Sequence, residues 1–381
     1  MTNLLAWAAI GLAGSPSAPP VDAYSRAFGP RASTLISRPT LRWEIWPIGK
    51  ARVTEAQMTL NGQRVQARYV PEERALVYTP PEHLEPGKYS VKCRVVIDGS
   101  LNATKEWDFT VSSYAARKLP PPSESQLRTL RAVNGVRSAM GLPGFIPDDR
   151  LNAASQAHSE YLHANNATGH YQKPGTPKFF GAAPGDRLEA YGFIQDSWEG
   201  VDYGSKSPEE AVGNLLDAPY HRIPFLQPGA PLIGSGYDGG RLALSFGTTD
   251  EVATIMYPYE GQRDVPVAWE ANERPHPLRL HLKERPVVGY PIVLAHFNED
   301  AQRIHIEAAE LKDRTTGKSV PIYLNTPAND DYLRCATILM ARRPLQPDTL
   351  YEVRVVGYEI LETGRKGASI SRTWRFTTAA H

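Results

Sequence analysis

Histidines outside the predicted helices are the first candidates for chemistry in this chain. The central segment holds four of the ten histidines, at His158, His163, His170 and His221. Imidazole titrates near neutral pH, so it serves as a general acid or base and as the commonest metal ligand. His158 repeats with the apolar positions of a predicted helix, which favours a hydrogen-bonded core residue, and His163 lies near that helix's end, where a positive charge is favoured. His170 and His221 fall in loops at element ends, so we expect any site to be built on them.

Several familiar catalytic motifs are missing or misplaced. The chain contains no His-Glu-x-x-His, Gly-x-Ser-x-Gly or P-loop string, so the common metalloprotease, α/β-hydrolase and nucleotidase mechanisms lack their central residues. The string Gly234-x-Gly236-x-x-Gly239 matches a dinucleotide fingerprint, but a predicted strand over 242–246 follows where a helix is required. We interpret it as a hairpin turn. We interpret Asp186-Arg187 as a structural ion pair.

The elements around these histidines mix helices and strands. Apolar residues at helical spacing over 123–166, broken at Gly141-Leu142-Pro143, predict two helices, the second starting at Pro147-Asp148-Asp149. Ser207 as N-cap and Pro208 at the first helical position predict another helix over 208–216. Alternating residues on both sides of Asp238-Gly239-Gly240 predict a hairpin. The centre is therefore predicted to be α+β.

Motifs in a fixed order run along residues 120–247. They are Leu151-Asn-Ala-Ala-Ser-Gln-Ala-His158-Ser-Glu-Tyr-Leu162, Gly169-His170, Trp198-Glu199-Gly200, Ser207-Pro-Glu-Glu-Ala-Val212, His221-Arg222 and Ile233-Gly-Ser-Gly-Tyr237. This series resembles the bacterial branch of the CAP superfamily, the cysteine-rich secretory, antigen 5 and pathogenesis-related proteins. No single motif would suffice, but their order and spacing make the likeness fairly specific. The resemblance implies a three-layer α-β-α sandwich with an open cleft.

The same resemblance implies a site. In that family the cleft carries two histidines and two acidic residues that can hold a divalent metal, usually zinc; here His170 and His221 match the histidines and Glu199 matches one glutamate. The position of the second glutamate falls near Asp217 and holds none. Two imidazoles and a carboxylate suffice for a zinc site with water in the fourth position, but equally for a metal-free hydrogen-bonded cleft, and both stay open. The candidates for a fourth group are Asp217, His158 and Glu210.

Two β-rich segments flank the centre. Residues 41–111 show alternating runs between turns, including an Asn61-Gly62 hairpin signal. The C-terminal segment repeats the same ending. The repeated residues are Leu84-x-Pro86-x-x-Tyr89-x-Val91 with Trp107-x-Phe109-Thr110, and Leu345-x-Pro347-x-x-x-Tyr351-x-Val353 with Trp374-x-Phe376-Thr377. The pattern resembles bacterial immunoglobulin-like (Ig-like) domains, which usually act as spacers or adhesion modules, and we expect both copies to share one β-sandwich fold without a site of their own.

Composition limits the partners and the compartment. Lysine plus arginine total 42 against 41 acidic residues, so no net field attracts nucleic acid or an anionic membrane. No run approaches the roughly 18 to 20 apolar residues of a membrane span. Residues 4–13 form a short apolar run before a proline-rich stretch, which resembles a signal peptide without its basic start, although an ordinary unstructured start also fits. We expect a secreted or cell-surface protein that has no membrane span and binds no nucleic acid.

At 381 residues the chain is too long for one core, and we divide it into a signal-like or linker segment (1–35), a β-sandwich (36–113), a CAP domain (120–258) and a second β-sandwich (266–380). The predicted fold class is multidomain, a central α+β CAP fold between two all-β Ig-like sandwiches. Three functions stay open: binding of an extracellular small molecule, lipid or peptide, metal-dependent hydrolysis with His170, Glu199 and His221 as catalytic residues, or a structural adhesive role.

Overall fold

A computed structural model describes residues 25–47 and 51–380. The predicted signal-like run over residues 4–13 lies outside the described residues. The chain divides into two compact units, one ending at Ala115 and the other beginning at Ala116, and each is described by itself. Within the described residues no helix is long and apolar enough to cross a membrane.

The first unit consists of two β-sheets around one core. The first sheet has the order β1-β3-β7-β6 and the second β2-β9-β8-β4-β5. The strands are β1 (Ser25–Gly29), β2 (Ser33–Ile36), β3 (Leu41–Ile45), β4 (Val53–Leu60), β5 (Gln63–Val65), β6 (Arg68–Val70), β7 (Ala75–Tyr78), β8 (Gly87–Ile97) and β9 (Leu101–Ala116), with a 3-10 turn, η2 (Pro71–Glu73), between β6 and β7. Asn61 and Gly62 join β4 to β5 with φ of 49° and 78°, which confirms the predicted hairpin.

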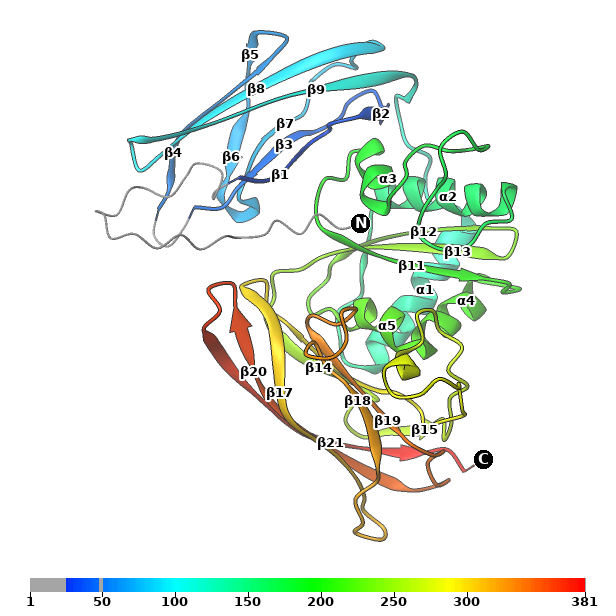
Figure 1. The fold of residues 1–381 in the computed structure, drawn as a ribbon. Coiled ribbons are helices and arrows are strands. Elements are labelled where there is room, and N and C mark those ends of the chain that lie inside the picture. The colour runs from blue at the N-terminus through cyan, green and yellow to red at the C-terminus, as the bar shows by residue number, and fades with distance from the viewer. Residues whose placement is uncertain (1–24, 48–50, 381) are drawn as a thin grey trace. The chain divides into compact units, whose positions relative to one another are not determined.

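The central part of the second unit is a four-stranded sheet with helices on both faces (Figure 1). The sheet has the order β10-β12-β13-β11. Its elements are α1 (Glu124–Ala139), β10 (Ile146–Pro147), α2 (Asp149–Ala164), α3 (Pro184–Ala190), β11 (Ser197–Tyr203), α4 (Pro208–Asp217), α5 (Pro219–Arg222), η3 (Ile223–Leu226), β12 (Leu232–Asp238) and β13 (Arg241–Gly247). The predicted caps are present, since the Asp148 side chain accepts from the first turn of α2 and Ser207 Oγ accepts from the amide of Glu210. The centre is therefore α+β.

Two glycines of the dinucleotide-like string explain the close packing of α2 on the sheet. A Cβ on Gly234 would lie 2.1 Å from the backbone of Leu151, and one on Gly236 would lie 2.2 Å from Gln156. Both glycines belong to β12, which pairs with β13 through the two-residue turn Gly239-Gly240. The predicted hairpin is confirmed, and these glycines serve backbone packing.

The C-terminal part of the second unit repeats the strand order of the first unit. Its sheets have the orders β14-β16-β19-β18 and β15-β21-β20-β17. The elements are β14 (Ala253–Tyr257), β15 (Gln262–Val265), η4 (Pro277–Leu280), β16 (Ile292–Phe297), β17 (Ala301–Asp313), β18 (Ile322–Asn325), β19 (Ala336–Ala341), β20 (Leu350–Leu361) and β21 (Lys366–Thr378). Matched in chain order, these strands reproduce both sheets of the first unit, where β5 is an extra edge strand. The predicted common strand order is thus confirmed, whereas Ig-like membership stays a prediction.

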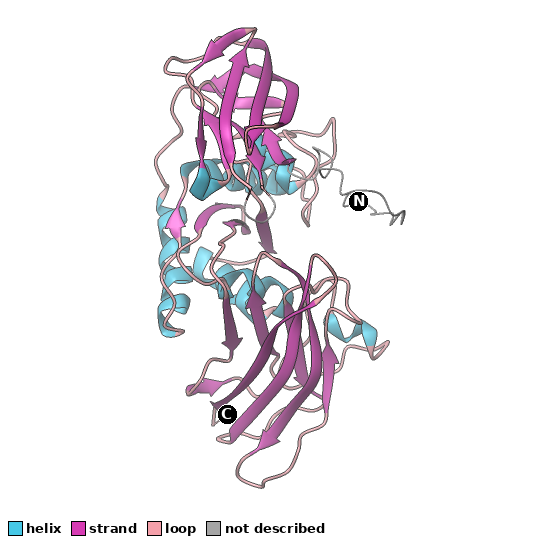
Figure 2. Ribbon diagram, turned by 90° about the vertical axis from the view of Figure 1, so that its left-hand side faces the viewer, coloured by secondary structure: helices cyan, strands magenta, loops and turns pink. Residues whose placement is uncertain are grey.

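One core joins the central and C-terminal parts of the second unit. Buried residues of the helical part, such as Leu215 and Phe225, belong to the same apolar cluster as Tyr290 and Trp374 of the β-part. Apart from η4, residues 253–380 form strands and loops (Figure 2). The predicted boundary at 258–266 stays a prediction, but no separate core marks it.

Candidate functional site

Strand β11 places Glu199 at one edge of the central sheet. Among the described strands, β13 alone pairs with β11, with Glu199 opposite Ser245. Neighbouring residues of a strand point to opposite faces. Glu199 accordingly reaches α2 and α3, while a Cβ on Gly200 would face Leu215 and His221 on the other side. The edge of β11 therefore gives access to both faces of the sheet.

His170 and Arg187 hold the two oxygens of Glu199. His170 Nδ1 lies 2.9 Å from Glu199 Oε1, and Arg187 Nη2 donates to Glu199 Oε2 at 2.5 Å. Arg187 Nη1 also donates to the carbonyl of His170 at 2.9 Å. Arg187 is thus paired with Glu199, and the predicted ion pair with Asp186 is wrong: the carboxylate of Asp186 accepts from the amide of Ala183 at the start of α3.

The charge on Glu199 determines the state of the His170 ring. Burial alone would raise the pKa of Glu199, but the hydrogen bond from His170 and the charge of Arg187 lower it below its ordinary value. An ionised carboxylate only accepts hydrogen bonds. His170 Nδ1 therefore carries a proton and donates it, which leaves Nε2 of His170 free to face a ligand.

His158 lies beneath this pair as a neutral core residue. It is fully buried, Gln172 Nε2 donates to its Nδ1 at 3.0 Å, and its Nε2 donates to the carbonyl of Gly169 at 3.3 Å. Burial lowers the pKa of His158 to about 4. The prediction of a hydrogen-bonded core histidine is confirmed.

His221 has its own carboxylate partner, and that partner is Glu273. His221 Nδ1 lies 2.6 Å from Glu273 Oε1, which also accepts from the backbone amides of Tyr220 and His221 at 3.0 Å each. The Glu273 side chain is fully buried. Glu273 lies in the segment between β15 and β16, more than fifty residues after His221 in the sequence, and was not among the predicted fourth-group candidates.

The two imidazole rings lie against each other. The ring centroids of His170 and His221 are 6.2 Å apart, with 18° between the planes. The His170 side chain is 38% exposed and that of His221 is 16% exposed. Each ring is held through Nδ1, and the described part of the chain offers neither Nε2 a hydrogen-bond partner. The structure thus brings together all three predicted site residues.

The other candidates for a fourth group lie elsewhere in the second unit. Asp217 accepts from the hydroxyl of Tyr290, and Glu210 accepts from the amide of Lys206 near the start of α4. A carboxylate that was not predicted, Asp202, lies on the His221 side of β11, where burial raises its pKa against the lowering effect of its hydrogen bonds from Ser205 and Asn214 and of the nearby His221.

The donor set does not assemble three metal ligands. In the described ranges no group of three or more His, Cys, Asp or Glu side chains is arranged to hold a metal ion. Both oxygens of Glu199 are already engaged, by His170 and by Arg187. His170, His221 and Glu199 are thus not arranged as a three-residue metal site among the described residues; zinc binding by them stays a prediction, and we derive no step through a metal.

Sequence patterns could not identify Glu273, and they misassigned Arg187. Glu273 stands in an irregular segment with no motif around it. The sequence suggested Asp186 as the partner of Arg187, but side chains at adjacent positions of a helix do not face each other. Helix α3 was not among the predicted helices, so nothing in the sequence indicated that Arg187 is one of its buried residues.

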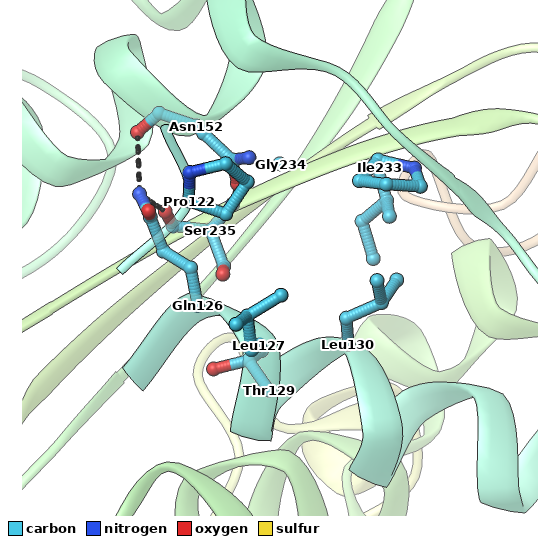
Figure 3. Close-up of a pocket in the computed structure, with 10 residues that line it drawn as sticks. Pro122, Gln126, Leu127, Thr129, Leu130, Asn152, Ile233, Gly234 and Ser235 are labelled. Atoms are coloured by element: carbon cyan, nitrogen blue, oxygen red, sulfur yellow. Dashed lines mark hydrogen bonds between the residues drawn. The ribbon is translucent and has the colours of Figure 1, made fainter. Parts of the chain in front are cut away.

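A small cavity elsewhere in the central part has a structural role. It lies between α1 and β12, and Gln126, Leu130 and Ser235 contribute to its lining (Figure 3). Its volume is about 10 Å³, which is room for at most one water molecule. Gln126 Nε2 donates to the carbonyls of Asn152 and Ser235 across it, and these bonds join α1, α2 and the sheet.

Comparison with known proteins gives a family match for the central part of the second unit. Residues 130–242 match the family model described as CAP, the cysteine-rich secretory protein family. An extracellular protein with an SCP domain from Bacillus anthracis is 13% identical, covering 55% of this chain and 78% of that one, with a TM-score of 0.28. A cysteine-rich secretory protein from Staphylococcus aureus is 10% identical, covering 55% and 76%, with a TM-score of 0.21.

A third structure covers less of this chain. An outer surface protein from Borrelia burgdorferi is 18% identical and covers 34% of this chain and 96% of that one, with a TM-score of 0.28. No curated protein matches this chain significantly.

The segment that matches the CAP family model, residues 130–242, contains His170, Glu199 and His221 but ends before Glu273. The family match therefore supports a CAP domain at residues 130–242 of this chain.

Proposed function

We propose that this chain is a secreted or cell-surface protein whose CAP domain binds an extracellular ligand at His170 and His221. The observation that carries the proposal is the pair of facing imidazoles, each held through Nδ1 by a buried carboxylate. Such support leaves Nε2 of each ring oriented and free to bond a polar group. A peptide backbone and a lipid headgroup both offer that chemistry.

The test measures binding of two named probes. Vesicles of phosphatidylethanolamine and phosphatidylglycerol represent the lipid source, and an array of random dodecapeptides represents the peptide source. Wild-type protein is expected to bind one of them, and His170→Ala and His221→Ala to lose at least tenfold in affinity. His163→Ala is the matched control, because His163 is half exposed and bonded to Asp238 away from the site. Equal binding by all variants, or no binding by wild type, would contradict the proposal.

Hydrolysis is the second candidate. An imidazole whose Nδ1 donates to a carboxylate is the arrangement of a general base, with Nε2 as the proton acceptor, and both His170 and His221 have it. Zinc bound by His170, His221 and Glu199 stays a prediction, tested by metal analysis of the purified protein with His170→Ala as control. Stoichiometric zinc that the variant loses, together with turnover of the bound probe, would favour the hydrolase. Absence of turnover with retained binding leaves the binding function.

A further inference from the structure

Helix α5, which carries His221, is held by residues that follow the CAP segment. Arg222 Nη1 donates to the carbonyl of Pro291 at 2.6 Å, and its guanidinium lies over the rings of Tyr257 and Tyr290 at 4.7 and 4.8 Å. Arg222 is fully buried. The residue after His221 is therefore fixed by the C-terminal part of the second unit.

The residue before His221 is fixed by the same part of the chain. The hydroxyl of Tyr220 donates to Asp330 and accepts from Arg279 Nη1 at 2.7 Å. Arg279 Nη2 also donates to Asp330 at 2.6 Å. Asp330 is buried and lies in the loop between β18 and β19.

Glu273 completes this set of contacts at His221 itself. Among the described residues, every hydrogen-bond donor to Glu273 belongs to α5: the amides of Tyr220 and His221, and His221 Nδ1. A buried carboxylate is costly unless it is fully bonded. Within the described part of the chain, the hydrogen bonds to its carboxylate come from α5 alone.

Comparison of the two β-parts shows that Glu273 and Arg279 lie in an insertion. In the first unit residues 37–40 connect β2 to β3, whereas residues 266–291 connect the equivalent strands β15 and β16. The loop that carries Asp330 is also longer than its equivalent, spanning 326–335 against 71–74. Both enlarged connections contact α5.

We propose that Glu273 is a positioning residue of the His170 and His221 site, so that the insertion at 266–291 completes a site the CAP segment does not complete alone. Glu273 accepts the Nδ1 proton of His221, which fixes the ring and leaves Nε2 bare toward the ligand, as Glu199 does for His170. Supporting bonds of this kind set both the orientation and the tautomer of an imidazole. The inference rests on the proposed function, because positioning matters only if His221 binds a ligand.

A purely structural Glu273 would cap the two amides of α5 without governing the imidazole. Histidine-side-chain ¹⁵N NMR of the full chain separates these roles, because it reports which ring nitrogen carries the proton. At pH 9, wild-type His170 and His221 are both expected to show protonated Nδ1 and bare Nε2. Glu273→Ala is expected to convert His221 to a mixture of tautomers and to leave His170 unchanged. Glu270→Gln is the matched control, an exposed glutamate three positions earlier, and should change neither ring.

Glu273→Gln covers the case in which Glu273→Ala does not fold. The amide has the shape of the carboxylate without its charge and accepts the Nδ1 proton of His221 more weakly, so a larger share of the Nε2–H tautomer of His221 is expected than in wild type. Asp202 and His170, the other titratable groups at His221, are untouched by this change. A share of the Nε2–H tautomer of His221 that is no larger than in wild type, in whichever of the two variants folds, would overturn the assignment. The NMR measurement needs no ligand. If neither the vesicles nor the peptides bind, the proposed function is contradicted, while the effect of Glu273 on the His221 tautomer can still be tested.

Discussion

The two β-parts have one strand order and different attachments. The first copy lies in a unit that ends at Ala115 and has its own apolar cluster. The second shares one cluster with the CAP domain and supplies Glu273, Arg279 and Asp330 to helix α5. The strands are equivalent, and the connections between them differ. The second copy of the scaffold thus contacts the proposed site through enlarged loops, which are the positions where a fold tolerates insertion.

The largest expected effect falls on the second unit alone. Arg187→Ala leaves the buried carboxylate of Glu199 without its cation, and breaking a buried pair in this way costs about 3–5 kcal/mol. Calorimetry should show a lower Tm for the transition of the second unit and an unchanged transition of the first. Arg128→Ala is the control, since its ion pair with Glu209 is exposed. An equal drop in Tm in both variants would contradict a stabilising buried ion pair between Arg187 and Glu199.

Acid should also destabilise the second unit selectively. His158 has a pKa of about 4 in the folded chain against an ordinary 6.5. Between these pH values His158 is protonated in the unfolded state and neutral in the folded state. Stability therefore falls as the pH is lowered through this window, by about 3 kcal/mol for this group. Urea unfolding from pH 7 to 4 should show this slope in wild type and a shallower one in His158→Gln. If the free energy of unfolding depends on pH equally in wild type and His158→Gln, His158 is not the cause of the acid destabilisation.

Equivalent tryptophans of the two copies offer a smaller, matched comparison. Trp374 Nε1 donates to the carbonyl of Pro258 at 2.9 Å, whereas Trp107 Nε1 has no partner among the described residues although it is buried. Trp374→Phe removes a hydrogen bond and leaves a buried carbonyl unpaired, so it should cost about 1–2 kcal/mol more than Trp107→Phe. The free energy of unfolding of each unit measures the difference. Equal losses of stability in the two variants would contradict the difference in hydrogen bonding between Trp374 and Trp107.

The smallest effect is a difference in cleavage rate. Arg117 and Lys118 are exposed in the connection between β9 and α1, where neither sheet nor helix holds the backbone. Trypsin should cut there first. Arg263 is also exposed, but it lies in β15, which pairs with β21, so cleavage at the predicted 258–266 boundary should be much slower. Comparable early cleavage at Arg263 would favour three independent domains.

Local features of the fold were predictable, and long-range ones were not. The Asn61-Gly62 turn, the Ser207 cap and the hairpin at Gly239-Gly240 depend on backbone preferences of a few adjacent residues. His170, Glu199 and His221 came from family motifs in a fixed order. Glu273 approaches His221 only through the packing of an irregular insertion, so nothing in its own neighbourhood indicates a partner.

Arg187 illustrates the opposite error. Asp186 and Arg187 are adjacent and oppositely charged, which suggested an ion pair. Adjacent side chains of a helix point in different directions, so Asp186 caps α3 while Arg187 reaches Glu199. Adjacency in sequence is thus a poor guide to pairing inside a helix.

A double-mutant cycle on His170 and His221 tests the central claim most directly. Binding of whichever probe wild type retains, vesicle or peptide, is measured for His170→Ala, His221→Ala and the double variant. If both rings hold one ligand, each single variant should lose nearly as much affinity as the double, because one lost contact already disables the site. Losses that simply add, or a double variant that binds like wild type, would contradict a single shared site.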